Sequence, residues 1–479
     1  MLFNSIEFAV FLPIVFLLYW FVFNRNLKLQ NLFIVVVSYV FYGWWDWRFL
    51  FLIAFTSFCS WGSGLLIEKN RENPKKAKAV SVLNIVINLL ILGVFKYYDF
   101  FVTSFADLFL GGKTDGLLLK IILPVGISFY TFQALSYSID VYRGKLKPTR
   151  DIVQFFAFVS FFPQLVAGPI ERATNLLPQF GKPRRFDYDT AVDGLRQILW
   201  GLFKKMVVAD GCGIYVDKVF STYQSQSGST LVLGVVLFAI QLYCDFSGYS
   251  EIAIGTAKLF GIKLMRNFNN PYFATSFADY WKRNHISLTT WFMDYVYYPL
   301  VGSSDRLVYW NFCMIVTFLL SGLWHGAGWT FVLWGLYQGV FIVISMNLAK
   351  QRKRFEKKHK LKNNRLYERL TMLVTFAIVC VGLILFRADC VSLAWGYFCN
   401  IFSKSLISVP WLMDQHYYFP VLLSIVVLFV VEWIQRDKDH AFDLSGIKSH
   451  ALKFGIYYAM VVALFWFGGH AESFIYFQF

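Results

Sequence analysis

The sequence predicts an all-helical protein that crosses a membrane many times and forms one membrane-embedded domain over residues 1–479. Hydrophobic residues make up 57% of the chain and charged residues only 15%, whereas soluble globular chains have about 45–50% and about 25%. The mean hydropathy is +0.52. Apolar runs of about 20 residues, the length that crosses a bilayer as a helix, recur along the chain.

The apolar runs predict 11 or 12 spans, because two of the runs are short. The first run follows Glu7 and has no basic segment before it, so we interpret it as a span and not as a cleaved signal peptide. The predicted spans lie near 5–23, 31–43, 49–67, 79–101, 121–142, 195–218, 231–258, 308–323, 326–348, 370–388, 418–434 and 451–469.

The distribution of charge predicts the sidedness of these spans. The net charge is +16, and the basic residues gather in the loops 68–78, 142–150 and 350–369, whereas the turns 44–46 and 221–230 contain no Lys or Arg. Threading the spans puts every basic loop on one face, which is the cytoplasmic face by the positive-inside rule. Both termini then lie outside. The basic cytoplasmic loops account for the net positive charge, so we do not interpret it as a sign of nucleic-acid binding.

Two regions do not read as simple spans. Residues 152–190 carry prolines that interrupt a long helix, with an apolar first half and a basic second half, so we expect a re-entrant or half-buried segment. Residues 259–306 are too polar to cross and rich in aromatic residues. No zinc pattern occurs among the seven cysteines, and Cys390 and Cys399 are the only pair in one loop, where a disulfide is one option.

The first candidate for chemistry is His285. If residues 279–300 form one helix, one face carries residues at i, i+4, i+7, i+11 and i+14, which are Trp281, His285, Leu288, Phe292 and Tyr295. His285 would then lie on the buried face of an amphipathic helix at the membrane surface. The alternative is an interfacial helix in which the imidazole only snorkels or caps a carbonyl.

The second candidate is His325, within "SGLWHGAGW". Residues 307–349 contain no Asp, Glu, Lys or Arg, and as a helix they would extend about 65 Å, enough for two crossings. Gly322, Gly326 and Gly328 permit a break or a close backbone approach beside the imidazole. An ionisable residue inside the membrane is a functional candidate; the alternative is a plain hairpin at the outer face.

The third candidate is "QLYCDFSGYSEIAIG", which places Asp245 within an apolar span, followed by Ser247 and Tyr249. The residues could line a polar tunnel or orient a histidine, or they could join helices by hydrogen bonds. Two histidines with a buried acid indicate acid–base chemistry, because a neutral imidazole can take a proton from a hydroxyl near pH 7.

Taken together, "SGLWHGAGW", "ADYWKRNHISLTTWFMDYVYYPL" and "CDFSGYSEIAIG", with "VAGPIER" and the terminal "FIYFQF", resemble the membrane-bound O-acyltransferase family, in its bacterial alginate O-acetyltransferase-like branch. The resemblance implies a bundle with re-entrant helices around a central funnel. It implies that His325 is essential for acyl transfer and that His285 occupies the second signature position. Asn284 and Met293 replace the Trp and Arg usual in this branch, so contacts near the donor differ.

The resemblance implies a bacterial inner-membrane enzyme that moves an acetyl group from a cytoplasmic thioester to an exported polysaccharide, directly or through a periplasmic partner. We expect His325 to act as general base and His285 to position or polarise the thioester, such as acetyl-CoA, with no bound cofactor. Two alternatives stay open: D-alanyl transfer of the teichoic-acid type, and polysaccharide transport without chemistry. The expected substrate-binding residues are Asp245, Ser247, Tyr249, Trp281, Asn284, Ser321 and Trp324.

Overall fold

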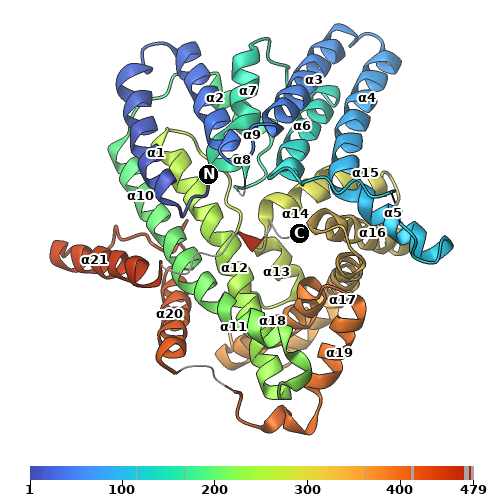
Figure 1. Ribbon diagram of the computed structural model, residues 1–479, viewed down its shortest axis with the longest axis vertical. Helices are drawn as coiled ribbons and strands as arrows, with labels where there is room; N and C mark the ends of the chain where they lie inside the picture. Colours follow the sequence, from blue (N-terminus) through green and yellow to red (C-terminus); the bar gives the residue numbers. More distant parts are fainter. Residues whose placement is uncertain (115, 167, 362, 412–414, 469–473, 476–479) are drawn as a thin grey trace. The chain divides into compact units, whose positions relative to one another are not determined.

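The computed structural model describes residues 1–114, 116–166, 168–361, 363–411, 415–468 and 474–475 (Figure 1). All regular elements within these ranges are helices, as predicted. The chain divides into two compact units, Met1–Ile198 with Ser250–Met265, and Leu199–Tyr249 with Arg266–Phe479. That the whole chain forms one domain stays a prediction.

Helices occupy each of the twelve predicted spans. By length and hydropathy, seven helices within the described ranges could cross a membrane, and three shorter apolar helices accompany them. Because these helices carry apolar side chains over lengths that match a bilayer, the protein is a multi-pass membrane protein.

The first unit is built from apolar helices whose starts are marked by capping residues. Asn26, Asn73 and Asp151 accept hydrogen bonds from the first backbone N–H groups of α2, α4 and α7. The helices are α1 (Ile6–Leu17), α2 (Leu27–Gly43), α3 (Phe49–Lys69), α4 (Pro74–Leu92), α5 (Tyr98–Phe109), α6 (Ile127–Tyr142), α7 (Ile152–Ser160), α8 (Phe162–Leu165), α9 (Ala173–Phe180) and α10 (Tyr188–Leu202), which runs on into the second unit.

The proline-rich region of the first unit forms short buried helices, α7 to α9. Two side chains of this region hold the segment that follows Phe260. Gln179 exchanges two hydrogen bonds with the backbone of Lys263, both at 2.9 Å, and Glu171 accepts one from the N–H of Met265. Burial raises the pKa of the Glu171 carboxyl to about 7. The segment is thereby fixed along its length.

The second unit contains the longer helices and the motifs singled out above. They are α11 (Asp210–Ser221), α12 (Gly228–Leu259), whose last turns belong to the first unit, α13 (Phe277–Arg283), α14 (Ile286–Phe292), α15 (Tyr298–Val301), α16 (Leu307–His325), α17 (Trp329–Lys358), α18 (Arg365–Arg387), α19 (Val391–Ile401), α20 (Gln415–Ile434) and α21 (His450–Phe467). A π-helical stretch, Phe203–Ala209, joins α10 to α11.

The pair α16 and α17 is held together by close backbone approach (Figure 1). A Cβ added to Gly335 would lie 2.5 Å from the carbonyl oxygen of Phe318, and one added to Gly339 would lie 3.0 Å from the Cα of Ile315. Small residues at such an interface let membrane helices pack without intervening side chains. Between the two helices, Gly326 and Gly328 are extended, which confirms the predicted break beside His325.

The predicted continuous helix over 279–300 is wrong. α13 ends at Arg283, Asn284 is extended, and His285 has φ +47°, in the left-handed region that ends a helix. A new helix, α14, begins at Ile286. The periodic apolar face is nevertheless real, since Trp281, Leu288 and Phe292 are all buried, although Tyr295 at its end is only half-buried.

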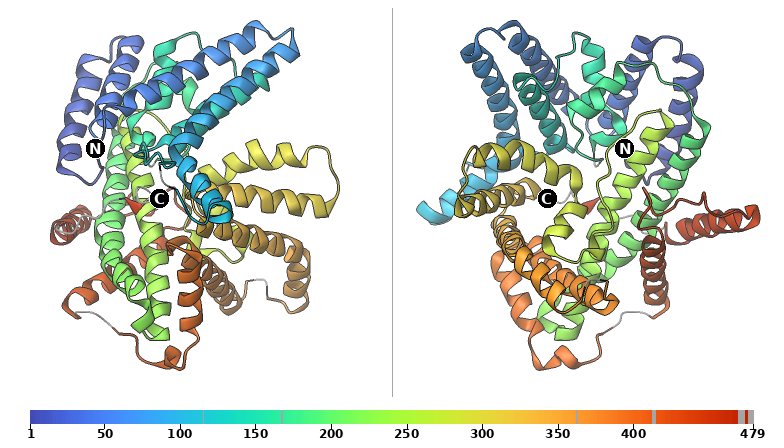
Figure 2. Two further views of the ribbon diagram at one scale, coloured as in Figure 1. Left: turned by 45° about the vertical axis from the view of Figure 1, so that its right-hand side comes forward. Right: turned by 180° about the vertical axis from the view of Figure 1, so that it is seen from behind.

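The last helix, α21, contacts the π-helical stretch Phe203–Ala209 but buries few of its side chains. Only Met460 is buried on it, and its side chains Phe465 and Trp466 are more than four-fifths exposed. In the right-hand view of Figure 2 it is the dark red helix that extends sideways, and in the left-hand view it is seen almost end-on. Cys390 and Cys399 are free thiols at the surface, so the optional disulfide is absent.

Candidate active site

A cavity of about 40 Å³ lies within the second unit, and both predicted histidines line it. Its walls come from α12, α13, α16, α17 and α18, together with the segment before α13 and the junction between α13 and α14. Most of the walls are aromatic. The lining residues are Leu242, Tyr243, Phe246, Phe268, Tyr272, Tyr280, Trp281, Asn284, His285, His325, Trp334, Leu383 and Phe386.

His325 reaches the cavity because it is the last residue of α16. The side chain is 4% exposed, and its ring lies 5.0 Å from the ring of Trp334 and 5.7 Å from that of Phe386, centroid to centroid. Both neighbours are edge-on, so the imidazole is clamped by aromatic rings. After His325 the helix stops, and the chain reverses before α17 begins at Trp329.

His285 faces the same cavity from the junction of α13 and α14. Its ring centroid lies 6.0 Å from that of His325 and 4.5 Å from that of Phe246. Burial lowers the pKa of His285 to about 3, so the ring is neutral near pH 7. A non-glycine residue with positive φ is strained, and such strain persists where the surroundings over-determine the geometry.

The surroundings that hold His285 include Asn267, which the sequence analysis did not identify. The Asn267 Oδ1 lies 3.2 Å from His285 Nδ1 and accepts hydrogen bonds from Ser287 Oγ at 2.8 Å and Ser287 N–H at 3.3 Å. The backbone carbonyl of Asn267 accepts from the N–H of Ile286 at 2.8 Å. Asn267 lies eighteen residues before His285 in an irregular segment, so helical spacing could not link the two.

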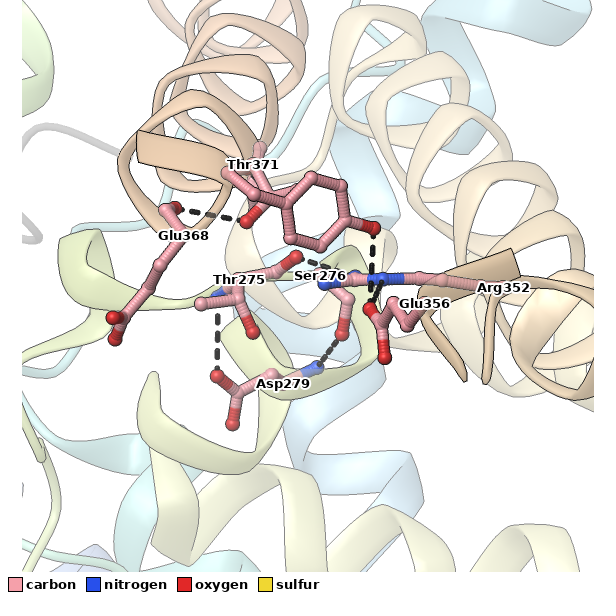
Figure 3. Close-up of polar contacts among 9 residues, drawn as sticks. Thr275, Ser276, Asp279, Arg352, Glu356, Glu368 and Thr371 are labelled. Carbon is pink, nitrogen blue, oxygen red and sulfur yellow. Dashed lines mark hydrogen bonds and ion pairs between the residues drawn. The ribbon is translucent and has the colours of Figure 1, made fainter. Parts of the chain in front are cut away.

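Polar contacts also fix the chain that leads into α13 (Figure 3). Arg352, on α17, donates from Nη1 to the carbonyl of Thr275 at 2.5 Å and from Nε to Glu356 at 2.8 Å. The N–H of Thr275 donates to Asp279 at 3.2 Å, and Ser276 caps the helix. α13 therefore starts from a fixed point, and it carries Trp281 to the cavity.

The predicted substrate-binding residues divide into two groups. Trp281 and Asn284 line the cavity, whereas Asp245, Ser247, Tyr249, Ser321 and Trp324 do not. Trp324 does not line the cavity, but its ring packs against both histidines, with centroids 5.8 Å from His285 and 5.0 Å from His325. Ser321 is buried one turn earlier on α16.

Asp245, Ser247 and Tyr249 contact a buried cluster of charges that the sequence analysis missed. Lys205 pairs with Asp245 at 2.8 Å and with Asp210 at 2.7 Å. Asp245 also accepts a hydrogen bond from the N–H of Ile475 at 2.8 Å, and Tyr249 packs on Phe474. These two are the described residues of the terminal "FIYFQF"; residues 476–479 lie outside the described ranges.

A second pair in this cluster reaches the cavity wall. Lys204 Nζ lies 2.5 Å from Glu432 Oε1, and both side chains are at most 3% exposed. Tyr243, which lines the cavity, donates its hydroxyl to the same Glu432 oxygen at 2.8 Å. Lys204 also lies 3.3 Å from Ser247 Oγ. The ion pair therefore holds one wall of the site.

We expect Gly326→Ala to destabilise the protein by about 1–3 kcal/mol, because overpacking of a close-packed site costs about that much. An added Cβ would collide with the ring of Phe331, which packs on Phe386 beside His325. Gly328→Ala is the matched control: its Cβ would meet Phe331 at an ordinary 3.6 Å. Thermal unfolding in detergent measures both, and equal midpoints would contradict this account of Gly326.

Comparisons of the sequence with known proteins identify a family. Residues 147–386 match the membrane-bound O-acyltransferase family, and this region contains both histidines. The probable alginate O-acetylase AlgI of Pseudomonas aeruginosa is 36% identical over 84% of this chain and 75% of its own length. The peptidoglycan O-acetyltransferase of Helicobacter pylori is 34% identical over 81% and 77%.

A more distant similarity joins the chain to the teichoic acid D-alanyltransferase of Bacillus subtilis, which is 29% identical over 55% of this chain and 68% of that protein. The three relatives are named for O-acetylation of alginate, O-acetyl transfer to peptidoglycan and D-alanyl transfer to teichoic acid. The matched region, the extent of the similarity and the many apolar helices agree with one another. The chain belongs to the membrane-bound O-acyltransferase family, and it is a multi-pass membrane O-acyltransferase.

Proposed function

We propose that this enzyme takes an acetyl group from a thioester on the cytoplasmic side and delivers it to a hydroxyl on the outer side of a bacterial inner membrane. The acceptor is an exported polysaccharide, reached directly or through a periplasmic partner. The single observation that carries the proposal is the meeting of His285 and His325 at one buried, aromatic cavity. We place the basic loops on the cytoplasmic face, as the positive-inside rule predicts, and both termini then face outward.

The choice of acetyl over D-alanyl rests on two observations. The relatives named for O-acetyl transfer match 81–84% of the chain, whereas the D-alanyltransferase of Bacillus subtilis matches 55%. In addition, the cavity that both histidines reach is lined mostly by aromatic side chains. An acetyl group carries no ammonium charge, so its passage leaves no cation to solvate among the aromatic walls.

In the proposed step, His325 takes the proton from the acceptor hydroxyl as the oxygen attacks the thioester carbonyl carbon. The new carbon–oxygen ester bond forms, the carbon–sulfur bond breaks, and the proton on His325 returns to the departing thiolate. A neutral imidazole suits both transfers near pH 7. The aromatic walls exclude water, which would otherwise hydrolyse the thioester.

The other predicted residues receive narrower roles. Trp281 and Asn284 contact substrate at the cavity wall, whereas Trp324 and Ser321 position His325 along α16. Asp245, Ser247 and Tyr249 act at greater distance, through the buried charges that support α12. The acyl donor is a substrate such as acetyl-CoA, and no resident cofactor takes part.

The proposal is tested with purified protein in liposomes. A radiolabelled acetyl thioester is supplied on one side and a soluble polysaccharide on the other, and label on the polysaccharide is measured with and without a carrier protein. We expect transfer from acetyl-CoA alone, and only when the thioester meets the face that bears the basic loops. Transfer that requires a carrier charged with D-alanine would overturn the choice of acetyl, and transfer with either orientation would overturn the sidedness.

A further inference from the structure

We propose that Asn267 is a positioning residue that fixes the tautomer of His285, so that His285 presents the lone pair of Nε2 to the cavity. His285 then accepts a hydrogen bond from an O–H or N–H group of a substrate and does not donate one to the thioester carbonyl. The inference rests on the proposed function only for the identity of the substrates. The tautomer itself follows from hydrogen bonding alone.

The first step is the orientation of the Asn267 amide. Its oxygen and nitrogen ends look alike in shape, so the orientation has to come from the partners. The backbone N–H of Ser287, 3.3 Å away, can only donate. The atom that faces it must therefore be the amide oxygen, and the hydroxyl of Ser287 adds a second donor to the same oxygen at 2.8 Å.

The second step concerns the imidazole. Nδ1 of His285 lies 3.2 Å from this amide oxygen, and an amide oxygen can only accept a hydrogen bond. Nδ1 consequently carries the hydrogen. A neutral imidazole has one N–H, so Nε2 is left as an acceptor. Nε2 is buried and has no hydrogen-bond partner within the described part of the chain.

The third step is that the arrangement is rigid. Asn267 is fully buried, and its own carbonyl is bonded to the N–H of Ile286. The backbone of His285 is held in the left-handed region between two helices. The ring of Phe246 stands at 88° to the imidazole, with centroids 4.5 Å apart. Rotation of the imidazole to exchange its two nitrogens would have to displace these neighbours.

This assignment changes the role expected for His285 from the sequence. Polarising a thioester carbonyl requires a hydrogen-bond donor at the cavity, and neutral His285 offers an acceptor there. The group it binds must carry a hydrogen, such as the acceptor hydroxyl or an amide N–H of the donor's arm. A hydroxyl held by Nε2 of His285 would be oriented for deprotonation by His325, whose ring centroid is 6.0 Å away.

The tautomer is read directly by nitrogen NMR of protein labelled with ¹⁵N-histidine, because protonated and unprotonated ring nitrogens have well-separated shifts. The His285 signals are identified by their loss in His285→Gln. We expect Nδ1–H in the wild type and in Asn267→Asp, which keeps an acceptor oxygen, and a mixture of tautomers in Asn267→Ala. Nε2–H in the wild type would overturn the inference, whatever the activity of the protein.

Acyl transfer supplies the second readout. We expect Asn267→Ala to lose about 10- to 100-fold, the usual cost of removing a residue that orients a functional histidine. Asn267→Asp should recover most of that loss. Asn269→Ala is the matched control, because it removes an amide from the same segment and the Asn269 Oδ1 has no hydrogen-bond partner among the described residues. Equal losses in Asn267→Ala and Asn269→Ala would contradict a specific role for Asn267.

The two readouts separate this inference from the proposed function. If no acetyl transfer occurs under any condition but His285 shows Nδ1–H, the proposed function fails and the tautomer assignment stands. If transfer occurs and the wild-type ring shows Nε2–H, the assignment fails and the proposed function stands. If Asn267→Ala does not fold, the wild-type spectrum still decides the tautomer.

Discussion

Replacing His325 with glutamine is expected to lower the rate of acyl transfer by about 10²- to 10⁴-fold, which is the usual contribution of a general acid–base group. Glutamine fills most of the space between Trp334 and Phe386, but it cannot take up a proton near pH 7. The protein should therefore fold and insert as before. The measurement is label on the acceptor per unit of folded protein, with folding followed by size-exclusion chromatography in detergent.

The matched control for this variant is His359→Gln. His359 is exposed at the end of α17, in the basic loop that we place on the cytoplasmic face. It should retain wild-type transfer, since it lies outside the cavity lining. Transfer within a factor of two of wild type by His325→Gln would remove the general base from the proposed mechanism and leave the cavity as a binding site only.

Replacing Glu432 with glutamine is expected to destabilise the protein by about 3–5 kcal/mol, the usual cost of leaving one member of a buried ion pair without its counter-charge. Lys204 would keep its charge in a site that is only 3% exposed. The new amide can still accept the hydrogen bond of Tyr243, so the loss reports on charge and not on that contact. Thermal unfolding in detergent or nanodiscs measures the change.

The double variant Glu432→Gln with Lys204→Met provides the control. Removing both charges of a buried pair is often close to neutral for stability, so most of the loss in the single variant should be recovered. If the single variant unfolds at the wild-type temperature, Lys204 is not held as a cation by Glu432. If the double variant is as unstable as the single one, packing and not charge explains the effect.

The sequence predicted the helices well because a bilayer imposes a long, nearly continuous apolar signal on each one. The run from Leu307 to Ala349 is an example: absence of charge predicted two helices, and Gly326 and Gly328 predicted the break that ends α16 at His325. Such features depend on residues close together in the chain. Because neighbouring residues determine these features, they can be predicted from the sequence alone.

The junction at His285 could not be predicted in this way. The apolar period of residues 279–300 continues across the break, because Trp281 and Leu288 are buried on either side of it. No glycine or proline marks the left-handed residue. The hydrogen bonds that hold it come from Asn267, in an irregular segment whose path depends on contacts distant in sequence. Periodicity describes burial, and it carries no information about such contacts.

The two buried lysines were missed for a different reason. Lys204 and Lys205 lie within the predicted span 195–218, and a charged residue in a span needs a partner. The same rule drew attention to Asp245, which the structure pairs with Lys205. Matching charges of opposite sign between predicted spans would have suggested this pair. The partner Glu432 lies near the end of another predicted span, and the sequence gives no sign that it meets Lys204.

The left-handed backbone at residue 285 bears on how stable versions of this enzyme are made. Glycine adopts that conformation without the cost of about 1–2 kcal/mol that other residues incur. Loss of the buried imidazole would, however, leave a cavity beside Phe246 and Trp324, and a cavity of that kind costs at least as much as the strain releases. Selection for thermostability therefore gains little at residue 285, and stabilised versions of the enzyme for crystallography or biotechnology can keep the histidine.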